Sequence, residues 1–222
     1  MRGFTSEQEM FDTMRDKLNA AVISDMLDRL GSREQAMRAD IRPVYQEAIV
    51  VGRAYPVLSA DIFEVSDDPY RGEIEAVDSL KPNSVVVIST NQSTRTCLWG
   101  ELLSTAARAR GARGAVIDGY TRDVAQITTM QFPTFATGMK AVDTAGRSMV
   151  VQHGSPVICG DVLVNPGDIV FGDIDGVVVI PKELEDKVIP LALEKMGKEN
   201  LVRNELLKGV LLRDAYAKYK VL

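Results

Sequence analysis

The chain has 222 residues, of which 45% are hydrophobic and 26% charged, and its formal net charge is −5. These values are typical of a globular protein with a sizeable core, and the negative charge argues against binding of nucleic acid. Two cysteines are too few for a disulfide framework, and a single histidine, His153, nearly excludes a histidine-based zinc site and Ser-His-Asp catalysis. A signal-peptide pattern and a membrane-spanning apolar run are both missing from the sequence, so we expect a cytoplasmic protein that binds no membrane.

The first fifty residues predict two helices followed by an irregular connection. Ser6 and Glu9 are spaced as a capping box, and apolar residues at helical spacing follow them. A second apolar pattern over residues 22–30 ends at Gly31, a residue type that commonly ends helices. Residues 32–47 are mixed and polar, and Pro43 excludes a continuous helix there.

The next fifty residues alternate between strand and helix patterns. Ala48–Leu58 predicts a strand, with a possible bulge at Gly52 and a strand edge or end at Pro56. Apolar spacing between Glu73 and Leu80 predicts a helix. Ser84–Ser89 predicts a short buried strand, and a polar loop over residues 91–98 leads to Gly100.

The stretch Trp99–Val124 is the most informative part of the chain. It predicts a helix that ends at Gly111, a buried strand at Ala115–Ile117 and a turn at Gly119. Arg122 and Asp123 then follow the carboxyl end of the strand. Ligand sites in open α/β proteins lie at that edge of the sheet.

The residues around this edge suit a small anionic substrate. Gly100 at a helix start exposes the N–H groups of Glu101, Leu102 and Leu103, which form an anion site. Arg122 can clamp a carboxylate with two hydrogen bonds, and Asp123 is an oxygen ligand of the kind that Mg²⁺ accepts. Together these groups would bind a 2-oxo acid and stabilise its enolate. The residues alone leave open a simpler interpretation, a capped helix followed by a surface Arg–Asp ion pair.

The last third of the chain predicts closely spaced short strands between residues 156 and 180, and helices after Pro181. His153 is expected in a loop, and Pro190 is expected to kink or divide the C-terminal helix. We interpret residues 1–222 as one domain of mixed α and β structure with a helical C-terminal arm at about 182–222. Apolar residues of this arm are expected to dock on the same subunit or on another: Leu201, Leu206 and Leu207.

Four sequence blocks together resemble the RraA-like family: WGELLSTAARARG, GAVIDGYTRD, FPTFATG and NPGDIVFGDIDGVVVIP. This family includes class II 4-hydroxy-4-methyl-2-oxoglutarate aldolases, which are also oxaloacetate decarboxylases, and regulators of ribonuclease E activity. The most specific feature is an acidic residue, twenty intervening residues and an Arg-Asp pair, which here are Glu101, Arg122 and Asp123. The resemblance implies an α/β fold of the swivelling β/β/α layered type that assembles as a homotrimer or homohexamer.

The resemblance also implies the parts of a catalytic site. Asp123 would hold Mg²⁺ or Mn²⁺ together with waters that Glu101 orients. Arg122 and the N–H groups of Leu102 and Leu103 would bind pyruvate or the pyruvyl part of a substrate. Glu199 of a neighbouring subunit matches a glutamate that completes the family's aldolase site; an ion pair with Arg203 on the same helix is the alternative for this residue.

Two departures from the family pattern concern the substrate. The family's aldolases commonly have Asp at the position of Glu101, and many have Lys in the loop where this chain has Arg147. The leading hypothesis is a metal-dependent carbon–carbon lyase that acts on 4-hydroxy-2-oxo acids and oxaloacetate. Because of the two departures, the identity of the aldol substrate is open. The second hypothesis is a non-catalytic regulator that binds a ribonuclease or another protein partner.

Overall fold

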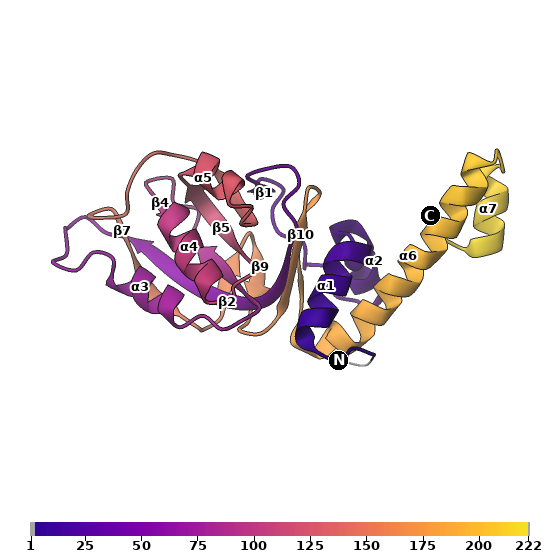
Figure 1. Ribbon diagram of the computed structural model, residues 1–222, viewed down its shortest axis with the longest axis horizontal. Helices are drawn as coiled ribbons and strands as arrows, with labels where there is room; N and C mark the ends of the chain where they lie inside the picture. Colours follow the sequence, from indigo (N-terminus) through magenta and orange to yellow (C-terminus); the bar gives the residue numbers. More distant parts are fainter. Residues whose placement is uncertain (1–2, 222) are drawn as a thin grey trace.

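The computed structural model describes residues 3–221 and shows a strongly twisted mixed sheet whose helices lie along one face (Figure 1). The opposite face is covered by residues 37–48 and by a short hairpin over residues 157–164. The strands are β1 (Arg42–Pro43), β2 (Val50–Asp61), β3 (Ser84–Ser89), β4 (Cys97–Trp99), β5 (Gly114–Thr121), β6 (Thr134–Met139), β7 (Ser148–His153), β8 (Val157–Cys159), β9 (Val162–Val164), β10 (Ile169–Asp173) and β11 (Gly176–Ile180). The helices are α1 (Glu7–Lys17), α2 (Ala20–Arg29), α3 (Arg71–Asp78), α4 (Glu101–Ala109), α5 (Val124–Thr129), the 3₁₀ turn η1 (Lys182–Leu184), α6 (Glu185–Leu207) and α7 (Leu212–Tyr219).

The main sheet has the strand order β1-β6-β5-β3-β2-β10-β11, with β4 paired to β5 and β7 paired to β2. Strands β2, β3, β5 and β6 run parallel, and β10 and β11 extend the sheet as an antiparallel pair. The parallel strands consist mainly of buried β-branched residues, as expected for strands covered on both faces. Their carboxyl ends lie at one edge, where the predicted site residues follow β4 and β5.

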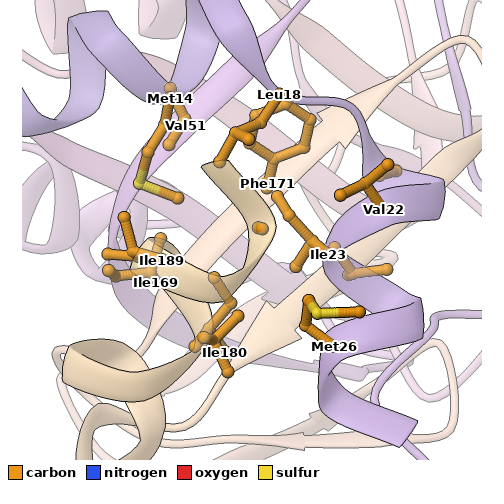
Figure 2. Packing of buried hydrophobic residues seen from close by; sticks show 14 of the residues in the cluster. Met14, Leu18, Val22, Ile23, Met26, Val51, Ile169, Phe171, Ile180 and Ile189 are labelled. Atoms are coloured by element: carbon orange, nitrogen blue, oxygen red, sulfur yellow. The ribbon is translucent and has the colours of Figure 1, made fainter. Parts of the chain in front are cut away.

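Helices α1, α2 and the first half of α6 pack together against β10 and β11. Figure 2 shows the buried side chains of this contact, with Phe171 and Ile23 among Met14, Val51 and Ile180. The second half of α6 and α7 extend away from the sheet (Figure 1). None of the helices in the described part of the chain has the length and apolar composition needed to cross a bilayer.

Strand β2 corrects two predictions made from single residues. Gly52 pairs in regular register with Val170 of β10 and does not lie in a bulge; a Cβ there would collide with the carbonyl oxygen of Asn83. Pro56 lies inside β2, and not at its end. It occurs between the segments of β2 that pair with β10 and with β7, so its missing N–H is not needed for either pairing.

Gly119 lies within β5, and not in a turn. A Cβ at this glycine would lie 2.8 Å from the side chain of Thr90, so glycine permits close approach of the neighbouring loop. His153 is the last residue of β7, and not in a loop as the sequence predicted. Its Nδ1 lies 2.8 Å from the Tyr55 hydroxyl.

Of the two alternatives predicted at Pro190, a kink or a division, the division is wrong, because α6 is continuous through this residue. The proline lies near the start of the helix, where it removes a single intrahelical hydrogen bond. Val188, Ile189 and Ala192 beside it are buried against α1 and α2, and this packing holds both segments of the helix in place.

Candidate functional site

A pocket of about 430 Å³ lies at the carboxyl edge of the sheet. Its wall is formed by α3, the junction of β4 with α4, the Arg-Asp pair after β5, and the loop that precedes β7. The described lining residues are Tyr70, Glu73, Ile74, Cys97, Leu98, Trp99, Gly100, Leu102, Leu103, Arg122, Asp123, Asp143 and Thr144. The pocket therefore contains Gly100, Leu102, Leu103, Arg122 and Asp123, all of which the sequence indicated.

Parallel pairing of β4 with β5 brings Gly100 and Asp123 together. Trp99 is the register partner of Thr121, and its carbonyl oxygen accepts hydrogen bonds from the Thr121 hydroxyl and the Arg122 N–H, both at 3.0 Å. Asp123 has a left-handed backbone with φ of 58°, and its Oδ2 accepts the Glu101 N–H at 3.2 Å. A Cβ on Gly100 would lie 2.6 Å from that oxygen, so only glycine leaves room for the carboxylate in this position.

The N-terminus of α4 provides backbone donors next to this carboxylate. Amides in the first turn of a helix have no intrahelical acceptor, and Gly100 has no side chain to cap them. The Glu101 N–H donates to Asp123, so it is not free for a ligand as the sequence suggested. The N–H groups of Leu102 and Leu103 are the remaining first-turn donors for an anion at this helix start.

Arg122 is held between two carboxylates. Its Nη1 lies 3.1 Å from Asp143 Oδ1, and its Nε lies 3.6 Å from Asp123 Oδ2. Tyr70 donates its hydroxyl to the other Asp143 oxygen at 2.5 Å. Burial pushes the Asp143 pKa up, but the Tyr70 hydrogen bond, backbone N–H groups and Arg122 outweigh burial, so this pKa lies below its usual value.

Glu73 is a pocket residue that sequence reasoning did not identify as functional. Its side chain points inward from α3, the residue is only 8% exposed, and its Oε1 has no hydrogen-bond partner within residues 3–221. Burial raises the Glu73 pKa to about 7, while a hydrogen bond with Thr144 acts in the opposite direction. The sequence does contain one indication that Glu73 is buried. It precedes the apolar residues Ala76 and Val77 by three and four positions, which places it on the buried face of α3.

Two predicted acidic residues lie outside the described lining of this pocket. The Glu101 carboxylate accepts a hydrogen bond from Thr105 at 2.8 Å and faces a shallow groove between α4 and α5. Glu199 lies on the extended part of α6, where its Oε1 is 3.4 Å from Lys195 Nζ. Arg203 bonds to Asn200, so the structure shows Glu199 paired with Lys195 and not with Arg203.

Arg147, the residue in the place of the family's lysine, is likewise outside the described lining. Its Nη1 donates to the backbone oxygens of Asp143 and Ala145. These bonds fix the loop that carries Asp143, and they direct the guanidinium of Arg147 to its own turn.

The donor set fits a hydrated divalent cation. No group of three or more His, Cys, Asp or Glu side chains able to hold a metal occurs in the part of the chain that the structure describes. Asp123 would be a single carboxylate ligand for such an ion, and Mg²⁺ is typically bound by one or two carboxylates while it keeps several waters. The space left by the missing Cβ of Gly100 keeps that carboxylate accessible from the pocket.

Comparison with known proteins relates this site to a family. Residues 20–179 match the model described as RraA-like: Aldolase/RraA. Protein DlpA of Legionella pneumophila is 29% identical over 201 residues, which cover 90% of this chain and 32% of DlpA. A Halalkalibacterium halodurans protein named "Putative 4-hydroxy-4-methyl-2-oxoglutarate aldolase" is 28% identical over 93% of both chains.

A solved structure shows the same fold. RraAS2 of Streptomyces coelicolor, described as an unusual member of the RNase ES inhibitor RraA protein family, superimposes with a TM-score of 0.79 at 23% identity. The superposition covers 89% of this chain and 97% of RraAS2. The fold class predicted from the sequence is therefore confirmed. With the family match extending over residues 20–179, the chain belongs to the RraA-like family.

Proposed function

We propose that this protein is a divalent-metal-dependent carbon–carbon lyase that cleaves 4-hydroxy-2-oxo acids and decarboxylates oxaloacetate through a pyruvate enolate. The observation that carries this proposal is the placement of the Asp123 carboxylate against Gly100, with Arg122 beside it in one pocket. The aldolase name given to a relative that is 28% identical supports the same reaction class.

The 2-oxo carbonyl and the carboxylate of the pyruvyl group would each have a binding partner in this arrangement. Asp123 would hold Mg²⁺ or Mn²⁺, which when bound polarises the 2-oxo carbonyl and stabilises negative charge on it. Arg122 and the N–H groups of Leu102 and Leu103 would hold the carboxylate. Arg122 must exchange Asp143 for the substrate, and its side chain is 40% exposed, so little free energy opposes that exchange.

The reaction balances without a further reactant. In the retro-aldol direction a base takes the 4-hydroxyl proton, the C3–C4 bond breaks, and its electron pair becomes the enolate, which is then protonated at C3 to give pyruvate. Loss of CO₂ from oxaloacetate leaves the same enolate. We assign Glu101 and Glu199 of a neighbouring copy to the ordering of water at this site, and Glu101 must release the Thr105 hydroxyl to take part.

We propose a trimer or hexamer because the C-terminal arm is apolar where it leaves the rest of the molecule. Its exposed side chains include Leu207 at 80%, whereas the first half of α6 is packed on α1 and α2. A second copy covering this surface would also bring Glu199 near a pocket other than that of its own chain. Light scattering at working concentration tests this, and a monomer would refute the shared site.

The deciding experiment is NMR of methyl-proton exchange of pyruvate in D₂O, with Mg²⁺ or Mn²⁺ and with EDTA. Exchange that needs the metal and is lost in Asp123→Ala is the expected result. Oxaloacetate decarboxylation is followed on the same samples. A folded, metal-supplied protein that supports neither reaction would refute the lyase and favour a non-catalytic regulator that binds a protein partner.

A further inference from the structure

The far side of the pocket, away from Asp123, is formed by α3 and the loop before β7. Its polar groups are Tyr70, Glu73, Asp143 and Thr144, and Ile74 provides an apolar contact. The Tyr70 hydroxyl and one Asp143 oxygen bond to each other, and the other Asp143 oxygen binds Arg122. Glu73 Oε1 is the buried atom of this wall that has no partner among the described residues.

The charges of the pocket favour a single carboxylate in the ligand. Arg122 is the only cationic side chain among the described lining residues, which also include three acids: Glu73, Asp123 and Asp143. The proposed binding mode uses Arg122 and the start of α4 for the carboxylate of the pyruvyl group. A second carboxylate at the other end of the substrate would face Glu73 and Asp143 with no cation to pair with. Burying it there is strongly unfavourable.

We propose that Glu73 is a specificity-determining residue that selects 4-hydroxy-2-oxo acids whose far end is uncharged and carries a hydroxyl group, and disfavours those with a second carboxylate. This inference rests on the proposed lyase function and names its substrate class. A hydroxyl group on the substrate supplies the missing hydrogen bond to Oε1, and an unmade bond at a buried polar atom is unfavourable. The same rule predicts slow decarboxylation of oxaloacetate, whose far end is a carboxylate.

Two substrates that differ at one carbon test this selection. 4,5-Dihydroxy-2-oxopentanoate ends in a hydroxymethyl group, and 4-hydroxy-2-oxoglutarate has a carboxylate at the same position. We expect kcat/KM of the natural protein, measured at pH 8 where Glu73 is mostly ionised, to be at least tenfold higher for the first. Glu73→Gln, which keeps the shape and removes the charge, is expected to reduce that ratio to less than threefold and to raise the rate on oxaloacetate.

Glu75→Gln is the matched control, because Glu75 lies on the same helix, is exposed and pairs with Arg71. It should leave the substrate ratio unchanged. Both variants should keep pyruvate methyl exchange, since neither residue belongs to the proposed pyruvyl half of the site. Calorimetry with 5-hydroxy-2-oxopentanoate and 2-oxoglutarate, which have no 4-hydroxyl group and are not cleaved, gives the same comparison without turnover.

The outcomes separate the two proposals. A natural protein that supports neither pyruvate exchange nor oxaloacetate decarboxylation refutes the lyase. If the natural protein supports pyruvate exchange but prefers the dicarboxylate substrate, the specificity assignment alone is overturned. The same holds if Glu73→Gln has the same kcat/KM ratio for the two substrates as the natural protein. If Glu73→Gln does not fold, the ratio of the two substrates with the natural protein still decides the selection.

Discussion

Gly100→Ala tests whether the site depends on the space beside Asp123. Gly100 has φ of −157° and ψ of −168°, an extended conformation that alanine adopts without strain. The added Cβ would lie 2.6 Å from Asp123 Oδ2, so the carboxylate must move by about 0.8 Å to reach an ordinary contact of 3.4 Å. A misplacement of about 1 Å in a catalytic group can lower the rate about a hundredfold.

The expected result is therefore a folded protein with little activity. Weakening the hydrogen bond between the Glu101 N–H and Asp123, together with a poorer N-cap, should lower the free energy of unfolding by about 1 kcal/mol. Metal-dependent exchange of pyruvate methyl protons should fall by roughly a hundredfold. Binding of Mn²⁺, measured by electron paramagnetic resonance, should weaken in parallel.

Gly197→Ala is the matched control, since Gly197 lies in α6 and a Cβ there meets no atom within 4 Å. It should leave exchange unchanged and stabilise the helix by up to about 1 kcal/mol. Full exchange and unchanged Mn²⁺ binding in Gly100→Ala would show that the position of Asp123 is not what the site requires, and would refute this reasoning.

Three further predictions concern other parts of the structure. Arg122→Lys keeps the charge but loses the planar fork, so KM for pyruvate exchange should rise about tenfold or more; an unchanged KM would remove Arg122 from carboxylate binding. Burial raises the Glu73 pKa from 4.5 to about 7, so the folded state binds the proton more tightly and stability falls as pH rises through this range. The free energy of unfolding of Glu73→Gln minus that of the natural protein should therefore be larger at pH 8 than at pH 5, by up to about 3 kcal/mol in urea unfolding. The same difference at both pH values would contradict the raised pKa. Asp118→Ala removes the buried carboxylate that pairs with Arg38 at 2.6 Å, and it should lower the free energy of unfolding by about 3 kcal/mol. Asp161→Ala removes an exposed partner of the same arginine, and it should change the free energy of unfolding by less than about 1 kcal/mol.

The grouping of Gly100, Arg122 and Asp123 in one pocket, the proposed pyruvyl half of the site, could be predicted from the sequence because it is local. A glycine before a helix, a buried strand and an Arg-Asp pair lie within Trp99–Val124, and each has its own pattern. The parallel pairing of β4 with β5 could not be predicted in the same way. Cys97–Trp99 is too short to show strand periodicity, and its neighbour lies beyond an entire helix.

The other half of the pocket is formed by contacts between distant segments. Glu73 resembles an ordinary polar residue at a helix start. It is buried because α3 packs against β7 and because the loop with Asp143 and Thr144 lies beside it. The Arg122–Asp143 pair similarly depends on a loop that no periodic pattern marks. Single-residue rules failed at Pro56 and Pro190 for a related reason, because neighbouring strands and helices determine whether a missing N–H matters.

The two halves of the pocket differ in how substitution would affect them. The pyruvyl half uses backbone groups and the space at Gly100, which are fixed by the strands β4 and β5 and by the start of α4. The far half uses side chains from α3 and a loop, where one exchange alters the charge without moving the sheet. Substitutions at Glu73 should therefore change which 4-hydroxy-2-oxo acids are cleaved, and so which carbonyl product is released, while formation of the pyruvate enolate persists. Substitution of Asp123 should abolish turnover of every substrate, and substitution of Gly100 should lower it for every substrate to a similar extent.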